Sequence, residues 1–276
     1  MSLAHARTWV PRERDPEAEQ RLTSAGLDPL LARVYAARGV TEPEQVKRRM
    51  DALARPDGLL GMDGAVAVLA AAVRRGERIA VVGDFDCDGA TSTALVVGVL
   101  RALGAEATYV IPDRFRFGYG LSPGIVAEAA ASLEPDVLVT VDNGIASHDG
   151  VAVAHEAGMR VVVTDHHLAP HVLPPADAIV NPNQPGCPFA SKHLAGVGVA
   201  FYVLAALRTE LRRVGWFDEQ GLAEPDLAGF LDLVAVGTVA DVVPLDHNNR
   251  ILVHQGLARI RAGTARPGIR ALVAVG

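Results

Sequence analysis

The sequence is poor in cysteine and in aromatic residues, and it has no long apolar run. Its two cysteines stand 100 positions apart, and aromatic residues make up 5% of the 276 positions. The sequence therefore argues against a disulfide framework, and its cysteines form no CxxC pair. Crossing a bilayer takes about 20 consecutive apolar residues, and residues 1–15 carry no apolar core of the kind that a secretory signal needs. These absences predict a protein without a membrane segment, in a reducing cytoplasm.

Positive charge is also scarce. The chain has 26 Lys and Arg against 32 Asp and Glu, a formal net charge of -6. A surface that wraps nucleic acid is usually basic, so the composition argues mildly against one. An acidic cleft that holds cations is compatible with it. Half of the residues are apolar, enough for a sizeable core in one large domain or two small ones.

Short apolar segments alternate with helical patterns through the middle of the chain. This alternation is typical of an α/β fold, with a mostly parallel sheet flanked by helices on both faces. Helical extensions are expected before it, over residues 1–63, and after it, because residues 195–276 carry helical periodicity. The predicted strands are 78–83, 107–111, 136–141, 160–164 and 178–181.

Acidic residues and histidines follow four of the predicted strands. In a parallel sheet these positions meet at the carboxyl edge, where ligands of open α/β sheets bind. The sequence therefore predicts one site built from four loops. Its members are Asp84, Asp86 and Asp88 after the first strand, Asp113 after the second, Asp142 after the third, and Asp165, His166 and His167 after the fourth.

A mixed set of carboxylates and imidazoles indicates divalent cations. Carboxylate oxygens suit hard cations, and imidazole adds affinity for Mn, Fe, Co or Zn. The set is too large for one ion. Two ions about 3.5–4 Å apart, bridged by a carboxylate, would use it, and such pairs hydrolyse phosphate esters. Asp241 is a further candidate ligand, because a carboxylate within the apolar stretch "VAVGTVADVV" is costly unless it is paired or metal-bound.

Several of these positions allow a second interpretation. Asp84 or Asp113 taken alone is explained equally well as a helix N-cap. Asp165 is interpreted as a carboxylate that orients the histidine pair rather than as a ligand. Arg114 and Arg116 form either a phosphate clamp or an ordinary exposed loop.

The acidic run also predicts a local geometry. If residues 84–88 stay extended, the three carboxylates point to one side of the chain and Cys87 points to the other. Cys87 is then expected to be a small packed side chain rather than a ligand.

Five motifs in this order resemble the DHH phosphoesterase superfamily, and within it the RecJ branch. The resemblance covers nearly the whole chain from about residue 45. It implies a 5′-to-3′ exonuclease that degrades single-stranded DNA with two Mn²⁺ or Mg²⁺ ions, in DNA repair and recombination. The motifs are "VVGDFDCDGATSTAL", "IPDRFRFGYGLS", "VTVDNGIASH", "VTDHH" and "LAGVGVAFYVL" followed by "GTVADVVPL".

The resemblance assigns roles to individual residues. Asp142 would bridge the two ions, and Asp84, in the same acidic run, is a further candidate ligand. His167 would face the scissile phosphate instead of a metal. The implied ligands are Asp86, Asp88, Asp142, His166 and Asp241.

The chain departs from the RecJ pattern in one respect. RecJ proteins continue through a long helix into a second domain with a Gly-Gly-His motif, and this sequence has no Gly-Gly-His. The resemblance thus predicts an N-terminal helical segment over 1–63, a DHH catalytic domain over 64–245, and the start of a linker towards a missing second domain over 246–276.

Three functions compete on these grounds. The first is the exonuclease, with single-stranded DNA as substrate and with a single-strand-binding protein and a helicase as further partners. The second is a phosphoesterase for short oligonucleotides or cyclic dinucleotides. The third is a non-catalytic DHH scaffold, which retention of every expected ligand argues against.

Overall fold

The computed structural model describes residues 10–276, which fall into two compact units. One unit ends at Arg48 and the other is Arg49–Gly276. The first nine residues of the predicted 1–63 segment lie outside the described residues. The first unit pairs α1 (Pro16–Ser24) with α2 (Pro29–Ala36) around a small core of Leu22, Ala32 and Val40. Each helix begins after a capping Asp, with Pro at its first position, as expected for helix N-termini.

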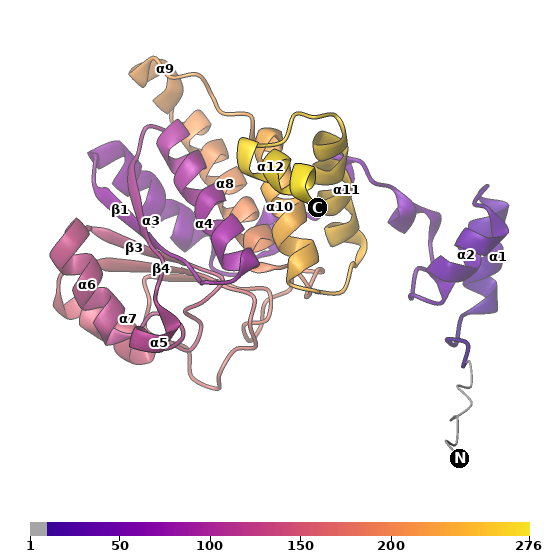
Figure 1. Ribbon diagram of the computed structural model, residues 1–276, viewed down its shortest axis with the longest axis horizontal. Coiled ribbons are helices and arrows are strands. Elements are labelled where there is room, and N and C mark those ends of the chain that lie inside the picture. Colours follow the sequence, from indigo (N-terminus) through magenta and orange to yellow (C-terminus); the bar gives the residue numbers. More distant parts are fainter. Residues whose placement is uncertain (1–9) are drawn as a thin grey trace. The chain divides into compact units, whose positions relative to one another are not determined.

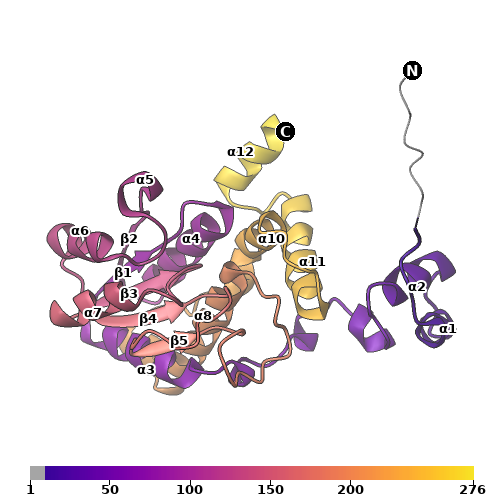
Figure 2. The ribbon, with the colours of Figure 1, turned by 90° about the horizontal axis from the view of Figure 1, so that it is seen from below.

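The second unit is built on a five-stranded parallel sheet, which confirms the predicted α/β class. The strand order is β2-β1-β3-β4-β5, with all four pairings parallel (Figures 1 and 2). The chain passes from β1 to β2 on one side and then returns to β3 on the other. The loops after β1 and β3 therefore flank the point where the strand order reverses, the usual ligand crevice of such sheets. The strands are β1 (Arg78–Val82), β2 (Glu106–Val110), β3 (Val137–Val141), β4 (Arg160–Thr164) and β5 (Ala178–Val180).

Helices cover both faces of this sheet, because successive strand residues point to opposite sides. Val81 and Val139 belong to the core beneath α3, α4 and α8, whereas Val82 and Leu138 belong to the core beneath α6 and α7 (Figure 1). Every residue of β3 is buried, which explains why this strand reads as a nearly continuous apolar run. The helices are α3 (Met62–Arg75), α4 (Cys87–Ala102), α8 (Gly196–Arg213), α6 (Pro123–Leu133) and α7 (His148–Glu156).

The last part of the chain is helical, as predicted. α10 packs against α4, α8 and α11, and Leu252 and Ile269 reach the larger core. The three-part division of the chain at residues 63 and 245 stays a prediction. The remaining helices of the described chain are α5 (Arg114–Phe117), α9 (Trp216–Gln220), α10 (Leu231–Ala240), α11 (His247–Arg261), α12 (Pro267–Val275) and the 3₁₀ turns Pro43–Val46, Met50–Ala52, Pro56–Gly58 and Leu227–Phe230.

Within residues 10–276, no single helix is long and apolar enough to cross a bilayer. Met50–Gly58 and α3 together have a suitable length and composition, but a 90° bend separates them. Leu69 and Val73 of α3 are buried in the core.

The extended geometry expected for residues 84–88 is wrong. α4 already begins at Cys87, so Asp88 lies in its first turn while Asp86 caps the helix. The expectation of a packed Cys87 is also wrong, because its side chain is exposed. The physical reason is the same for both: a helix turns successive side chains by about 100°, so the alternation of a strand ends where the helix begins.

Candidate metal centre

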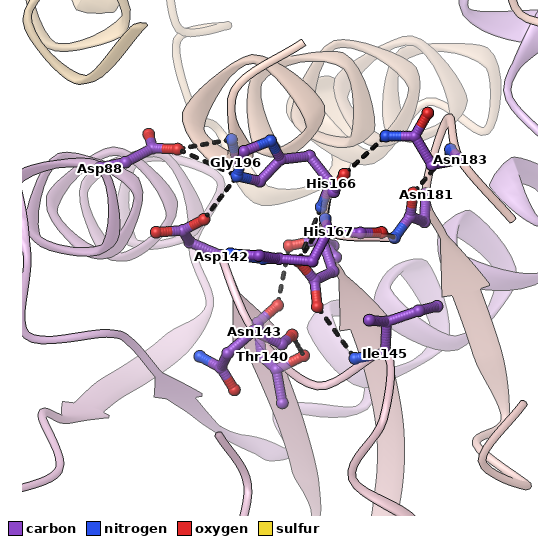
Figure 3. Close-up of polar contacts among 12 residues, drawn as sticks. Asp88, Thr140, Asp142, Asn143, Ile145, His166, His167, Asn181, Asn183 and Gly196 are labelled. Atoms are coloured by element: carbon purple, nitrogen blue, oxygen red, sulfur yellow. Dashed lines mark hydrogen bonds and ion pairs between the residues drawn. The ribbon is translucent and has the colours of Figure 1, made fainter. Parts of the chain in front are cut away.

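The acidic loop after β1 places three carboxylates in three different environments. Asp84 and Asp88 are buried, whereas Asp86 is exposed. Asp86 accepts the N–H of Gly89 at 2.9 Å as the cap of α4. The carboxylate of Asp88 contacts the start of α8, where it accepts hydrogen bonds from the backbone N–H groups of Gly196 at 2.6 Å and Val197 at 3.0 Å (Figure 3). The unpaired N–H groups of a helix N-terminus favour a negative charge at this position.

Asp142 follows β3 in a left-handed backbone conformation with φ of 61°. Non-glycine residues rarely adopt this conformation, and they cluster at functional sites when they do. The side chain of Asn143 supports the turn, because its Nδ2 donates to the carbonyls of Val82 at 3.1 Å and Val141 at 2.9 Å. The Asn143 amide thus ties the loop after β3 to the end of β1.

The imidazole of His166 faces three of the predicted carboxylates. Its Nε2 lies 3.1 Å from Oδ1 of Asp142, 3.6 Å from Oδ2 of Asp241 and 4.0 Å from Oδ2 of Asp88. Of these atoms, Nε2 of His166, Oδ1 of Asp142 and Oδ2 of Asp241 are buried without a hydrogen-bond partner. Buried polar atoms are nearly always paired, so their convergence fits a cation at this place.

The remaining predicted ligands join the same cluster. Three overlapping groups each bring their ligand atoms within 4.8 Å of one another. Asp142 and His166 each belong to two groups, as expected if more than one ion binds. The groups are Asp84, Asp86 and Asp142; Asp88, His166 and Asp241; and Asp142, His166 and His167.

Asp165 and Tyr119 hold the second histidine of the pair. Oδ1 of Asp165 lies 2.8 Å from Nδ1 of His167 and also accepts the N–H groups of both histidines. The hydroxyl of Tyr119 lies 3.2 Å from Nε2 of His167. The hydrogen bond to Asp165 places a proton on Nδ1 and raises the pKa of His167 to about 9. Asp165 thus contacts His167, as an orienting carboxylate should.

Burial dominates the acid–base behaviour of the cluster. It raises the pKa of Asp88 to about 8, with the Asp142 carboxylate adding to the effect. Burial also raises the pKa of Asp142 to about 8, assisted by Asp86. The pKa values of Asp84 and Asp241 are raised for the same first reason. Without cations, the cluster therefore holds protons at neutral pH, since like charges at close range disfavour ionisation.

The two predicted arginines lie on α5, outside the cluster. The guanidinium of Arg114 stacks 4.2 Å from the ring centre of Phe85, within the acidic loop. Arg116 forms an ion pair with Glu128 at 3.3 Å. Both side chains are exposed, so they border the cluster without bonding to it. Asp113 caps α5 through the N–H of Phe115, which agrees with the helix-cap interpretation.

Five residues that support the cluster were missed by reasoning from the sequence. They are Tyr119, Asn143, Asn181, Asn183 and Gly196. An added Cβ at Gly196 would lie 2.7 Å from Cβ of Asp142, so only glycine fits there. Asn181 and Asn183 follow β5 at the same sheet edge, and their Asn-Pro-Asn motif was the available signal.

The chain is similar in sequence to known proteins. Residues 78–238 match the family described as "DHH family, N-terminal domain". The single-stranded-DNA-specific exonuclease RecJ of Dickeya dadantii is 58% identical over 263 residues, which are 95% of this chain and 45% of that protein. The Escherichia coli protein of the same name is 56% identical over 96% of this chain and 45% of its own length.

Two solved structures of RecJ proteins are also similar to this chain. The crystal structure of exonuclease RecJ bound to manganese superimposes with a TM-score of 0.67 and 40% identity, covering 79% of this chain and 52% of that one. RecJ from Thermus thermophilus in complex with Mn²⁺ gives a TM-score of 0.71 and 35% identity, covering 94% and 35%. The chain spans less than half the length of the two curated relatives named above.

Proposed function

The chain belongs to the DHH family, as its motifs predicted, and on this premise we propose that it binds two divalent cations and hydrolyses phosphodiester bonds of single-stranded DNA from the 5′ end. One observation carries the proposal. The buried atoms of His166, Asp142 and Asp241 that have no hydrogen-bond partner converge at the carboxyl edge of the sheet. A scaffold without catalysis would have no use for such a cluster, because each unpartnered buried polar group costs roughly 1–3 kcal/mol.

The donor set indicates which cations the cluster takes. It consists of carboxylate oxygens with a minority of imidazole nitrogens, a combination suited to Mn²⁺, and to Mg²⁺ where oxygen ligands predominate. Asp142 is proposed as the bridging ligand because it belongs to two of the three groups and, unlike the imidazole of His166, offers two ligand oxygens. Asp84 lies in the same group as Asp86 and Asp142 and is a candidate for a sixth ligand. The proposed ligands are Asp86, Asp88, Asp142, His166 and Asp241.

Bound cations would activate water and neutralise charge on the phosphate in the transition state. The other residues act around that chemistry. His167 is half-exposed, with Asp165 at its Nδ1, so its Nε2 can donate a hydrogen bond to a phosphate oxygen. Asp165 holds the ring in this orientation and keeps the imidazolium form accessible. Tyr119 limits the rotation of the ring from the other side.

A single-stranded substrate is supported by the surface beside the cluster. Phe115 on α5 is 95% exposed and Tyr119 is 56% exposed. Aromatic faces stack on unpaired bases, and guanidinium groups such as those of Arg114 and Arg116 bind phosphates. This surface is small, and the charge of the chain is acidic. Short oligonucleotides or cyclic dinucleotides are therefore the second candidate substrate class. A single-strand-binding protein, a helicase and a cytoplasmic setting stay predictions.

The proposal is tested by cleavage of a single strand at high enzyme concentration with Mn²⁺. We expect mononucleotides to be released in order from the 5′ end. Asp142→Ala should abolish release, whereas Asp149→Ala, which removes an exposed carboxylate on α7, should leave it unchanged. Cleavage confined to dinucleotides would favour the second substrate class. No cleavage of either substrate would contradict phosphodiester hydrolysis by this chain.

A further inference from the structure

Side chains hold the backbone of the His166–His167 pair on both of its edges. On one edge, Oδ1 of Asp165 accepts the N–H of His166 at 2.7 Å and the N–H of His167 at 3.1 Å. On the other edge, Nδ2 of Asn183 donates to the carbonyl of His166 at 2.6 Å, and Nδ2 of Asn181 donates to the carbonyl of His167 at 3.0 Å (Figure 3). Each N–H and each carbonyl of the pair therefore has a side-chain partner.

The two asparagines are themselves held in place. Asn181 is fully buried, and its Oδ1 accepts the backbone N–H of Asn183 at 2.7 Å. Both residues follow β5, which pairs with β4 so that Val180 lies beside Thr164. The segment after β5 thus places two amide donors beside the loop that follows β4. Each amide bonds to one histidine only.

The position of His166 requires this support. Its Nε2 must stay near three carboxylate oxygens that belong to different elements. Because both imidazoles are attached to this backbone, a displacement of residues 166–167 would move them away from the cluster. Partners that fix a metal-binding histidine commonly tune metal affinity, and losing one costs roughly 10- to 100-fold.

We propose that Asn183 and Asn181 are positioning residues with separable effects. Asn183 orients His166 for cation binding, and Asn181 orients His167 towards the phosphate. The inference rests on the proposed function of the cluster and extends it to the fifth strand. It assigns a role to a loop that carries no ligand of its own.

The first test uses the metal-free chain and so does not depend on cation binding. Nuclear magnetic resonance signals of the His166 and His167 rings are compared between the wild type, Asn183→Ala and Asn181→Ala. We expect the His166 signals to shift or broaden most in Asn183→Ala. The matched control is Gln184→Ala, because the side-chain Nε2 of Gln184 donates to the carbonyls of Leu60 and Ile179.

The second test measures Mn²⁺ affinity by calorimetry and the turnover of a single strand. Asn183→Ala should weaken Mn²⁺ binding by about 10- to 100-fold. Asn181→Ala should keep most of the affinity and lower kcat, with KM little changed. The melting temperatures of the metal-free variants show whether a loss comes from unfolding instead.

Failure of the positioning role and failure of the proposed function give different results in these tests. Unchanged histidine signals in Asn183→Ala overturn the inference, and so does a Gln184→Ala chain that is perturbed to the same degree. If Asn181→Ala does not fold, the comparison between Asn183→Ala and Gln184→Ala decides alone. A wild-type chain that binds no Mn²⁺ contradicts the proposed function, while the metal-free comparison still judges the positioning role.

Discussion

At the residue scale, the cluster contains carboxyl groups that the fold buries together even without a cation. The side chains of Asp88 and Asp142 are almost completely enclosed, and the pKa of each is raised to about 8. Burial makes the ionisation of both groups unfavourable, and a bound cation would remove this cost. The acid–base state of the cluster and its cation binding should therefore change together with pH.

The free energy of unfolding of the metal-free chain should respond to these two groups. Between pH 4 and 8 the unfolded carboxyls are ionised, whereas the folded ones keep their protons. The folded state then binds more protons, so their contribution to stability falls as pH rises through this window. Asp142→Asn removes one such group. In EDTA we expect it to melt at a higher temperature than the wild type at pH 8, with a smaller difference at pH 5.

With Mn²⁺ present, the wild type should melt at a higher temperature than the Asp142→Asn chain at pH 8. Because protons compete with the cation for the carboxylates, Mn²⁺ should raise the wild-type melting temperature more at pH 8 than at pH 5. The Asp142→Asn chain should gain little at either pH. Equal stabilisation of the wild type at the two pH values would show that the cluster does not titrate with cation binding.

His167 offers a second prediction at this scale. We expect His167→Ala to keep Mn²⁺ affinity and to lower turnover by roughly 10²–10³-fold, the usual effect of removing one group that stabilises transition-state charge. Calorimetry and single-turnover cleavage measure the two quantities. His167 also belongs to one of the three possible ligand groups, so a collapse of Mn²⁺ affinity would identify it as a ligand instead.

At the element scale, the start of α8 is in close contact with the turn after β3. Gly196 begins α8 and leaves no room for a side chain beside Asp142. Gly196→Ala should force the two elements apart, destabilise the fold by about 1–3 kcal/mol and weaken Mn²⁺ binding. Gly229→Ala is the control, because an added Cβ there meets nothing within 4 Å. Similar denaturation midpoints and Mn²⁺ affinities in both variants would contradict the close contact.

The elements themselves were largely predictable, for a physical reason. Strands buried on both faces must be continuously apolar, so β1, β3 and β4 were recognisable as short apolar runs. The edge strand β2 is largely exposed, and its predicted bounds were shifted by one residue. The start of α4 was not predictable, because an Asp that caps a helix and an Asp that binds a cation look the same in a sequence. Asp86 is positioned to do both.

The candidate cluster was predictable only in part. Its carboxylates and histidines follow strands, so a shared sheet edge was enough to predict that they meet. Asn181, Asn183 and Tyr119 act through hydrogen bonds to other loops. Such contacts depend on tertiary structure and produce no pattern of spacing in the sequence.

At the scale of the whole molecule, charge limits how this chain can hold a nucleic acid. With 26 basic against 32 acidic residues, it offers few phosphate contacts. We expect it to bind a 5′-phosphorylated single strand more weakly than the full-length Escherichia coli relative at the same salt concentration, with steep salt dependence. Fluorescence anisotropy titrations measure this, and Mn²⁺ affinity should be similar in the two proteins. Equal DNA affinity would show that this chain already contains a complete groove.

The convergence of distant loops at the sheet edge has a consequence for how readily the chain unfolds and is digested. A cation bound between Asp88 and Asp241 would join segments separated by more than 150 residues, with His166 between them. Closing so large a loop reduces the entropy of the unfolded chain, much as a covalent cross-link does. The bound ions would then act as reversible cross-links between the loops at the sheet edge. A protease that cuts only unfolded chains should therefore digest this protein faster when a chelator is present.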